Sequence, residues 1–173
     1  MKFDSPAVHD ATRTAALVVD RLKTRETDRV VFAESCTAGM VAGLLGQFPG
    51  ISNWLCGSAV TYRESVKQKW LGVSPETLEK HTAESLQTTQ EMAVGVLQSI
   101  VEATHSTAVT GHLGPQAPSE IDGLIFICVA RRSTNTGEIE VIANKRFQLQ
   151  TETRIDRQFE SAFRVFETLH ANL

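Results

Sequence analysis

Ser35 is the first residue whose type and position could do chemistry. It belongs to the polar run of residues 34–37, which directly follows the apolar stretch 30–33. A serine at the junction between a strand and a helix lies beside free backbone N–H groups, here those of the next three residues. Such groups stabilise an anion, either the oxyanion of an acyl transfer or a phosphate. Serine also caps helices very often, so the spacing alone leaves both a nucleophile and an N-cap open.

Two further side chains could work with a nucleophile in this run, and one competes with it. Cys36 is a rival nucleophile, although no histidine lies near it in the sequence to activate it. Lys67 falls on a predicted short helix, residues 63–71, where a lysine is usually solvated, as we expect for Lys69. A lysine buried beside a serine acts as a general base, because burial lowers its pKa. Tyr62 is the only tyrosine and ends a predicted strand, where it either borders the site or packs as a strand-end aromatic.

The third candidate segment is the run Thr-Gly-His-Leu-Gly-Pro at residues 110–115. Gly111 lets the backbone approach a ligand, and His112 is either a loop residue or a ligand contact. Arg154 and Arg157 open the predicted last helix, where the positive end of the dipole favours an anionic partner over a second cation. A solvated face is the commoner arrangement for such arginines. The chain contains neither a GxGxxG nor a GxxxxGK motif.

These segments meet only if the chain folds as an open α/β sheet, in which ligands lie beyond the carboxyl ends of the strands. Hydrophobic periodicity and turn residues predict strands and helices that alternate, with a hairpin late in the chain. The expected strands are 30–33, 56–62, 107–111, 123–130 and 138–147. The expected helices are 6–22, 37–45, 63–71, one that begins at 75, 84–103 and one that carries residues 155–169. We therefore predict a three-layer α/β/α sandwich with a mixed, mostly parallel sheet and one antiparallel strand, in one domain spanning 1–173.

Composition narrows the classes of function. Of 173 residues, 42% are apolar and 21% charged, which is typical of a globular protein, and the net charge of −3 disfavours a nucleic-acid surface. We expect no membrane association, because no apolar window is long enough to span a bilayer and the first residues lack a signal peptide's apolar core. Three scattered cysteines favour a reducing cytoplasm over a disulfide framework. The five histidines do not fall at metal-ligand spacing, so we expect no metal.

Residues 33–39 read Ala-Glu-Ser-Cys-Thr-Ala-Gly and resemble the AESCTGG motif of the CinA C-terminal domain family, the PncC-type nicotinamide mononucleotide deamidases. The resemblance continues in order over nearly the whole chain, through residues 48–52, 57–62, Lys67, 71–73, 75–78, His81, Ser85, 109–111, 114–115 and Gly123. It implies an α/β/α sandwich, a homodimer, and a chain that carries the deamidase domain alone. It also implies hydrolysis of the carboxamide of nicotinamide mononucleotide to nicotinate mononucleotide and ammonia, with no metal and no organic cofactor.

The resemblance assigns roles residue by residue. The family's serine falls on Ser35, which would attack the carboxamide, and its lysine falls on Lys67, which would take the serine proton. Its tyrosine falls on Tyr62, which would orient or pack against the ring. The arginine of its last helix falls on Arg154, which would bind phosphate together with the loop after Gly111. The residues expected to touch the substrate are Cys36, Thr37, Ala38, Gly39, Gly111, His112 and Arg154.

Three departures from the family pattern bear on the substrate. Ala38 replaces the first glycine of the family's pair, and Glu64 stands where the family typically has asparagine, adding a negative charge. Residues 110–118 read TGHLGPQAP in place of TGIAGPGGG, which predicts a changed phosphate or ribose contact. Two alternatives therefore stay open beside the amidohydrolase: a non-catalytic nucleotide-binding or regulatory homologue, and a dimeric scaffold with an empty pocket.

Overall fold

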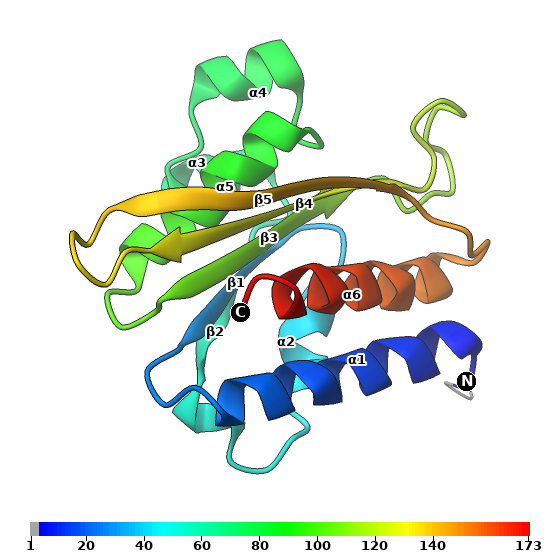
Figure 1. Cartoon of the computed structure of the whole chain (residues 1–173). Helices are drawn as coiled ribbons and strands as arrows, with labels where there is room; N and C mark the ends of the chain where they lie inside the picture. The colour runs from blue at the N-terminus through cyan, green and yellow to red at the C-terminus, as the bar shows by residue number, and fades with distance from the viewer. Residues whose placement is uncertain (1–3) are drawn as a thin grey trace.

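A five-stranded sheet forms the middle layer of the protein (Figure 1). The computed structural model describes residues 4–173. The strands, in the spatial order β2-β1-β3-β4-β5, are Leu55–Val60, Val30–Glu34, His105–Gly111, Leu124–Arg132 and Ile139–Gln148. β1 pairs in parallel with β2 and β3, whereas β4 is antiparallel to both of its neighbours. Four strands therefore run one way and one runs the other, which confirms the predicted mixed, mostly parallel sheet.

Helices cover both faces of this sheet and complete the predicted three layers (Figure 1). The helices on one face are α1 (Pro6–Lys23), α2 (Met40–Leu45) and α6 (Arg154–His170). Those on the other face are α3 (Glu64–Leu71), α4 (Pro75–His81) and α5 (Leu86–Ser99). A short 3₁₀ turn, Ile51–Asn53, precedes β2. None of the helices in residues 4–173 is long and apolar enough to cross a membrane.

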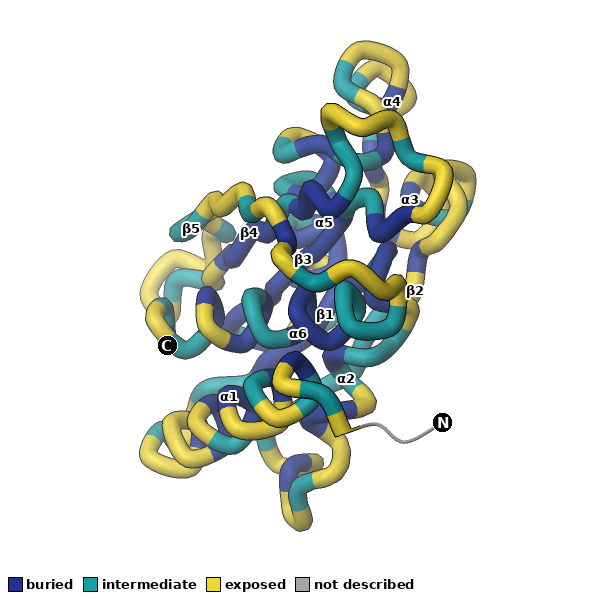
Figure 2. Tube along the Cα trace, turned by 90° about the vertical axis from the view of Figure 1, so that its right-hand side faces the viewer, coloured by how far each residue is buried: buried dark blue, intermediate teal, exposed yellow. Residues whose placement is uncertain are grey.

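The sheet separates two apolar cores because side chains alternate along each strand. In β1, Val30 and Phe32 pack toward α1 and α6, while Val31 and Ala33 pack toward α5. All of them are buried, as is typical of a central parallel strand covered on both faces. In Figure 2 the central strands β1, β3 and β4 are mostly buried, whereas the edge strands β2 and β5 and the outer faces of the helices are more exposed. β1 is therefore held firmly on both of its faces, and this fixes the position of Ser35, the residue that follows it.

Two predicted helices begin or end elsewhere. α2 starts at Met40, not at residue 37, because Ala38 and Gly39 adopt left-handed φ angles of +53° and +96°, which no right-handed helix accommodates. α5 spans Leu86–Ser99 and not 84–103. Ser85 caps its start by accepting a hydrogen bond from the Thr88 N–H, and the chain leaves the helix in an extended conformation after Ser99. Val101, expected on the buried face of that helix, is 84% exposed.

Candidate active site

Ser35 follows the last residue of β1, at the carboxyl end of the central parallel strands. Its backbone N–H donates to the Val109 carbonyl at 3.1 Å, which extends the pairing with β3 by one step. On the other side the Thr61 N–H donates to the Glu34 carbonyl at 2.8 Å, which extends the pairing with β2. Ser35 is itself buried. It lies between two strand ends, where open α/β sheets bind their ligands.

The Lys67 amine reaches Ser35 from α3. Its Nζ donates to Ser35 Oγ at 2.9 Å and to the Thr61 carbonyl at 2.7 Å, and the side chain is fully buried. Lys67 and Leu71, one helical turn apart, are the residues of α3 that face inward, whereas Lys69 is exposed. The structure thus brings together two of the residues predicted from the sequence, although 32 positions separate them.

The environment of Lys67 favours a neutral amine. Burial lowers the pKa of the Lys67 ammonium below its ordinary value of 10.5, because the charged form loses its hydration. The carboxylates of Glu84 and, more weakly, Glu64 act in the opposite direction. Lys67 forms no ion pair with any residue between 4 and 173. A neutral lysine in hydrogen-bond contact with a serine hydroxyl can accept its proton.

A buried carboxylate organises the turn after Ser35. Glu34 is fully buried and accepts five hydrogen bonds of 2.8–3.1 Å, several of them from N–H groups that α2 leaves unpaired at its start. The donors are Thr37 Oγ1, Ser58 Oγ and the backbone N–H groups of Gly39, Val41 and Ala42. Glu34, and not Ser35 or Thr37, therefore caps α2. The Ser35 hydroxyl is left in contact with Lys67.

The turn offers fewer oxyanion donors than the sequence predicted. The Ala38 N–H donates to the Ser35 carbonyl at 3.1 Å, and the Gly39 N–H is bound to Glu34 at 2.9 Å. The prediction that Ala38 presents a free N–H is therefore wrong, because the turn of residues 35–38 closes with that N–H on the Ser35 carbonyl. The N–H groups of Cys36 and Thr37 remain the candidate donors of this turn.

Cys36 is a poor rival to Ser35. Burial raises the pKa of the Cys36 thiol to about 12, so the group stays protonated at neutral pH. Its carbonyl accepts a hydrogen bond of 3.3 Å from Gln158 of α6, which ties the turn to the helical layer. These contacts favour a packing role for Cys36 over nucleophilic attack.

A cavity of about 400 Å³ opens next to Ser35. Its walls come from the turn after β1, the second residue after β2, the residue before Ser85, the loop after β3 and the start of α6. The second residue after β2 is Tyr62, so the strand ends at Val60 and not, as predicted, at Tyr62. The lining residues are Ser35, Cys36, Tyr62, Glu84, Gly111–Pro118 and Arg154. At its edge Arg154 donates to the Tyr62 hydroxyl at 2.7 Å and to the Gly114 carbonyl. Residues predicted from three separate segments therefore border one space.

Arg157 holds the loop and does not border the cavity. Its guanidinium binds both carboxylate oxygens of Asp122, at 2.7 and 2.9 Å, and lowers the pKa of that carboxyl chiefly through these hydrogen bonds. A Cβ on Gly114 would lie 2.6 Å from Asp122 Oδ1, so this pair requires glycine at 114. Gly111 is required in the same way, since a Cβ there would lie 2.5 Å from the Leu124 carbonyl oxygen. Packing within the protein thus explains both glycines.

Glu84 is a charged residue of the cavity that the sequence did not single out, whereas its neighbour His112 is one of the residues predicted to touch the substrate. Glu84 Oε2 and His112 Nε2 lie 3.7 Å apart, and each side chain is 28% exposed. In the sequence Glu84 stood only as the first residue of a predicted helix, and no local signal marks it as a site residue. It reaches the cavity because α5 begins two residues later, at Leu86.

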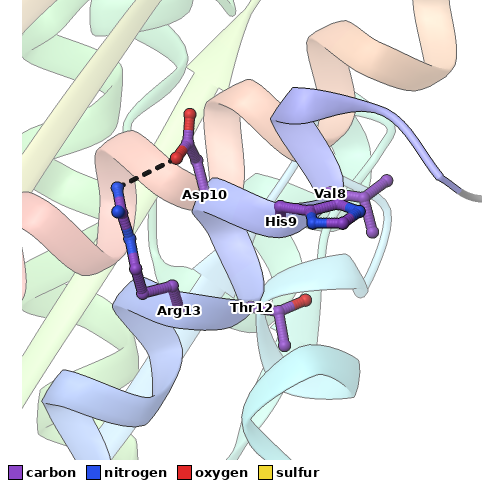
Figure 3. Close-up of a pocket in the computed structure, with 5 residues that line it drawn as sticks. All are labelled: Val8, His9, Asp10, Thr12 and Arg13. Atoms are coloured by element: carbon purple, nitrogen blue, oxygen red, sulfur yellow. Dashed lines mark hydrogen bonds and ion pairs between the residues drawn. The ribbon is translucent and has the colours of Figure 1, made fainter.

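Another hollow, of about 570 Å³, lies along α1 (Figure 3). It is lined by Val8, His9, Asp10, Thr12 and Arg13. Asp10 and Arg13 form an ion pair of 3.0 Å, and His9 is bound to Asp4. Its charged groups are therefore engaged with one another, and none of its side chains contacts Ser35 or Lys67. Within residues 4–173, no group of three His, Cys, Asp or Glu side chains could hold a metal ion.

Comparisons with known proteins support one family. The model of the CinA C-terminal domain matches residues 11–169. A CinA-like protein of Myxococcus xanthus is 41% identical over 123 residues, which are 70% of this chain and 29% of the relative. A Shewanella oneidensis protein named nicotinamide-nucleotide amidohydrolase PncC is 41% identical over 103 residues, 58% of this chain and 24% of that protein. The matched segments thus span less than a third of these relatives.

Solved structures agree with this assignment. A competence/damage inducible protein CihA from Agrobacterium tumefaciens superposes with a TM-score of 0.83 at 29% identity, covering 99% of this chain and 98% of that one. The competence damage-inducible protein A (ComA) of Klebsiella pneumoniae gives a TM-score of 0.82 at 26% identity, with coverages of 93% and 95%. The fold, the serine turn and the family match lead to the same conclusion: the chain belongs to the CinA C-terminal domain family.

Proposed function

We propose that the protein hydrolyses the carboxamide of nicotinamide mononucleotide, giving nicotinate mononucleotide and ammonia. The observation that carries the proposal is the hydrogen bond of 2.9 Å between Ser35 Oγ and the fully buried Lys67 Nζ. A serine that contacts a desolvated amine has an activated hydroxyl, which suits acyl transfer. The relative named nicotinamide-nucleotide amidohydrolase gives the substrate class.

Acylation begins with neutral Lys67. Its amine keeps its hydrogen bond to the Thr61 carbonyl and accepts the Ser35 proton on its lone pair, while Oγ attacks the carboxamide carbon. The negative charge on the carboxamide oxygen is stabilised by the N–H groups of Cys36 and Thr37. Loss of one such donor costs roughly 3–4 kcal/mol of transition-state stabilisation in comparable sites. Lys67 then returns its proton to the amide nitrogen, the C–N bond breaks, and ammonia leaves.

Deacylation repeats these steps with water. Lys67 takes a proton from a water molecule that attacks the Ser35 ester, and the ester C–O bond breaks as Ser35 recovers its proton. The products are a nicotinate carboxylate and free serine, so one water is consumed for each ammonia released. Tyr62 borders the cavity and would pack against the pyridine ring, and Arg154 would bind the phosphate.

The test is direct. Purified protein is incubated with nicotinamide mononucleotide, ammonia is measured by a coupled assay, and the acid product is identified by chromatography. We expect turnover that falls by a factor of about 10³ or more in Ser35→Ala and in Lys67→Ala. Lys69→Ala, on the exposed side of the same helix, and Ser52→Ala, on the surface, should retain the wild-type rate. Absence of ammonia, or unchanged rates in both dyad variants, would overturn the proposal.

A second candidate, a non-catalytic nucleotide-binding or regulatory homologue, is favoured by one observation. Residues 111–118, which line the cavity beside Ser35, lie in the segment that departs from the family pattern, while Ser35 and Lys67 match it. Calorimetry separates the two candidates: tight nucleotide binding without ammonia release supports the binder, and turnover excludes it.

A further inference from the structure

The Glu84 carboxylate is an unusual lining for a cavity whose serine contacts a lysine base. It accepts no hydrogen bond from any residue between 4 and 173, and the basic side chain next to it is that of His112, whose Nε2 lies 3.7 Å away. That distance is too long for a hydrogen bond. The free protein therefore presents to its cavity a carboxylate that no residue between 4 and 173 hydrogen-bonds.

Glu84 lies close enough to the dyad to act on it. It borders the cavity that contains Ser35 and also the adjoining hollow lined by Tyr62 and residues 63–65. Among the carboxylates it has the largest effect on Lys67, and it raises the pKa of that amine. Glu84 thus stabilises the protonated form of Lys67, which cannot accept the serine proton, and so opposes the larger effect of burial. A positive charge brought into the same cavity would offset this effect.

We propose that Glu84, beside His112, is a specificity-determining residue that selects carboxamides on a positively charged ring over neutral carboxamides of the same shape. The inference rests on the proposed function, since it names the substrate class that this site prefers. N-alkylpyridinium carboxamides belong to the preferred class, because the ring nitrogen carries a full positive charge near the scissile group.

Two consequences follow from a cationic substrate at this position. The ring charge interacts favourably with Glu84 in a cavity partly removed from water, where ion pairs are screened less than at the surface. The same charge destabilises the Lys67 ammonium, so the general base loses its proton when the correct substrate is bound. Hydrolysis then creates a carboxylate beside Glu84, and repulsion between the two anions favours release of the product.

The experiment compares two ligands that differ in ring charge. Nicotinamide mononucleotide has a cationic ring, and its dihydro form has a neutral ring with the same ribose, phosphate and carboxamide. Dissociation constants are measured by calorimetry on Ser35→Ala protein, which consumes neither ligand. We expect the cationic ligand to bind about tenfold more tightly, equivalent to about 1.4 kcal/mol. In Ser35→Ala/Glu84→Gln this ratio should fall to within about twofold of unity.

Glu64→Gln is the matched control. Glu64 is an exposed carboxylate in the first turn of α3 that also acts on Lys67, but it does not line the Ser35 cavity. Its substitution should leave the ratio unchanged. An unchanged ratio in Glu84→Gln, or equal changes in both variants, would overturn the inference. Thermal melting checks that Glu84→Gln folds, as expected for a side chain without a hydrogen bond.

The ammonia assay keeps this inference separate from the proposed function. Ligand binding without ammonia release by the wild-type protein refutes the hydrolase, while the binding ratio still decides the role of Glu84. Turnover combined with an unchanged ratio refutes the role of Glu84 alone. Absence of binding by either ligand refutes both.

Discussion

The Arg154 guanidinium donates a hydrogen bond of 2.7 Å to the hydroxyl of Tyr62, 92 positions earlier in the chain. The same guanidinium donates to the Gly114 carbonyl. One side chain from the start of α6 therefore joins the second residue after β2 to the loop after β3 at the edge of the cavity. An anion that binds Arg154 has to compete with or share these two contacts.

The first prediction concerns this arginine. Arg154→Ala should raise KM for nicotinamide mononucleotide by about 10- to 100-fold, because a charge-assisted hydrogen bond to phosphate contributes about 1.5–3 kcal/mol. The same variant should change KM for nicotinamide riboside, which lacks the phosphate, by less than about threefold. Steady-state kinetics with both compounds measure the difference.

Arg157→Ala is the control for Arg154→Ala. Arg157 is bound to Asp122 and to the Thr151 carbonyl, so its loss should loosen the loop and lower the melting temperature. Arg157→Ala should impair the hydrolysis of nicotinamide mononucleotide and of nicotinamide riboside to the same extent. Equal losses for both compounds in Arg154→Ala would assign Arg154 to loop support instead of phosphate binding.

The second prediction concerns pH. The value of kcat/KM should rise tenfold per pH unit on its acidic side and level off below pH 10.5, because Lys67 must lose its proton and burial lowers its pKa below that value. In Glu84→Gln the rise should move to lower pH, since the carboxylate that raises the Lys67 pKa is gone. A rate profile that is flat from about pH 6 to about pH 9 contradicts the role of Lys67 as base.

The titration of Lys67 should also make the free energy of unfolding depend on pH. Between the lowered pKa of folded Lys67 and 10.5, the unfolded chain binds more protons than the folded one, so the free energy of unfolding increases with pH across that window. Below both pKa values the folded state bears the full cost of burying an ammonium. Lys67→Met should remove this component of the pH dependence, as measured by urea unfolding at several pH values.

The third prediction identifies the nucleophile. At neutral pH iodoacetamide should modify Cys56 first, because Cys56 is half-buried, whereas Cys36 and Cys128 are buried with thiol pKa values raised to about 12. Mass spectrometry of partly labelled protein gives the order. Rapid labelling of Cys36 that abolishes activity, and that substrate prevents, would instead make Cys36 the nucleophile.

The fourth prediction concerns the turn after Ser35. Ala38 has a left-handed φ of +53°, which costs a residue with a Cβ about 1–2 kcal/mol. Glycine removes this cost but adds about 0.4–1 kcal/mol of unfolded-state entropy. Ala38→Gly should therefore increase the free energy of unfolding by about 0.5–1 kcal/mol. Ala42→Gly, in α2, should decrease it by about 1 kcal/mol, and a destabilising Ala38→Gly would contradict the argument.

The sequence was sufficient for features that depend on local pattern. The apolar run before Ser35 predicts β1, and the inward spacing of residues along the last helix predicts α6, because each element buries one face or both. The contact between Ser35 and Lys67 is different. It depends on β2 lying directly beside β1, so that α3 returns over the strand end, and this is a property of the strand order.

Other features escaped prediction because each residue has an ordinary local explanation. Glu34 looks like a polar turn residue, yet it is fully buried and caps α2, which requires the donors of β2 and the turn to converge on it. Glu84 looks like a solvated residue at a helix start, whereas His112, its neighbour in the cavity, is among the residues predicted to touch the substrate. Their proximity depends on the position of the loop after β3 relative to the start of α5. Homodimer formation and cytoplasmic location stay predictions.

The loop after β3 is tethered at both of its ends by the same helix. Arg154 holds the Gly114 carbonyl near the beginning, and Arg157 holds Asp122 near the end. Of the intervening residues, 115–118 form part of the cavity wall without supporting Ser35 or Lys67. Substitutions, or a change in length, between the two tethers can alter ligand preference while the reacting groups keep their positions. The substrate can therefore change during evolution through substitutions in this loop, while Ser35 and Lys67 keep their contact.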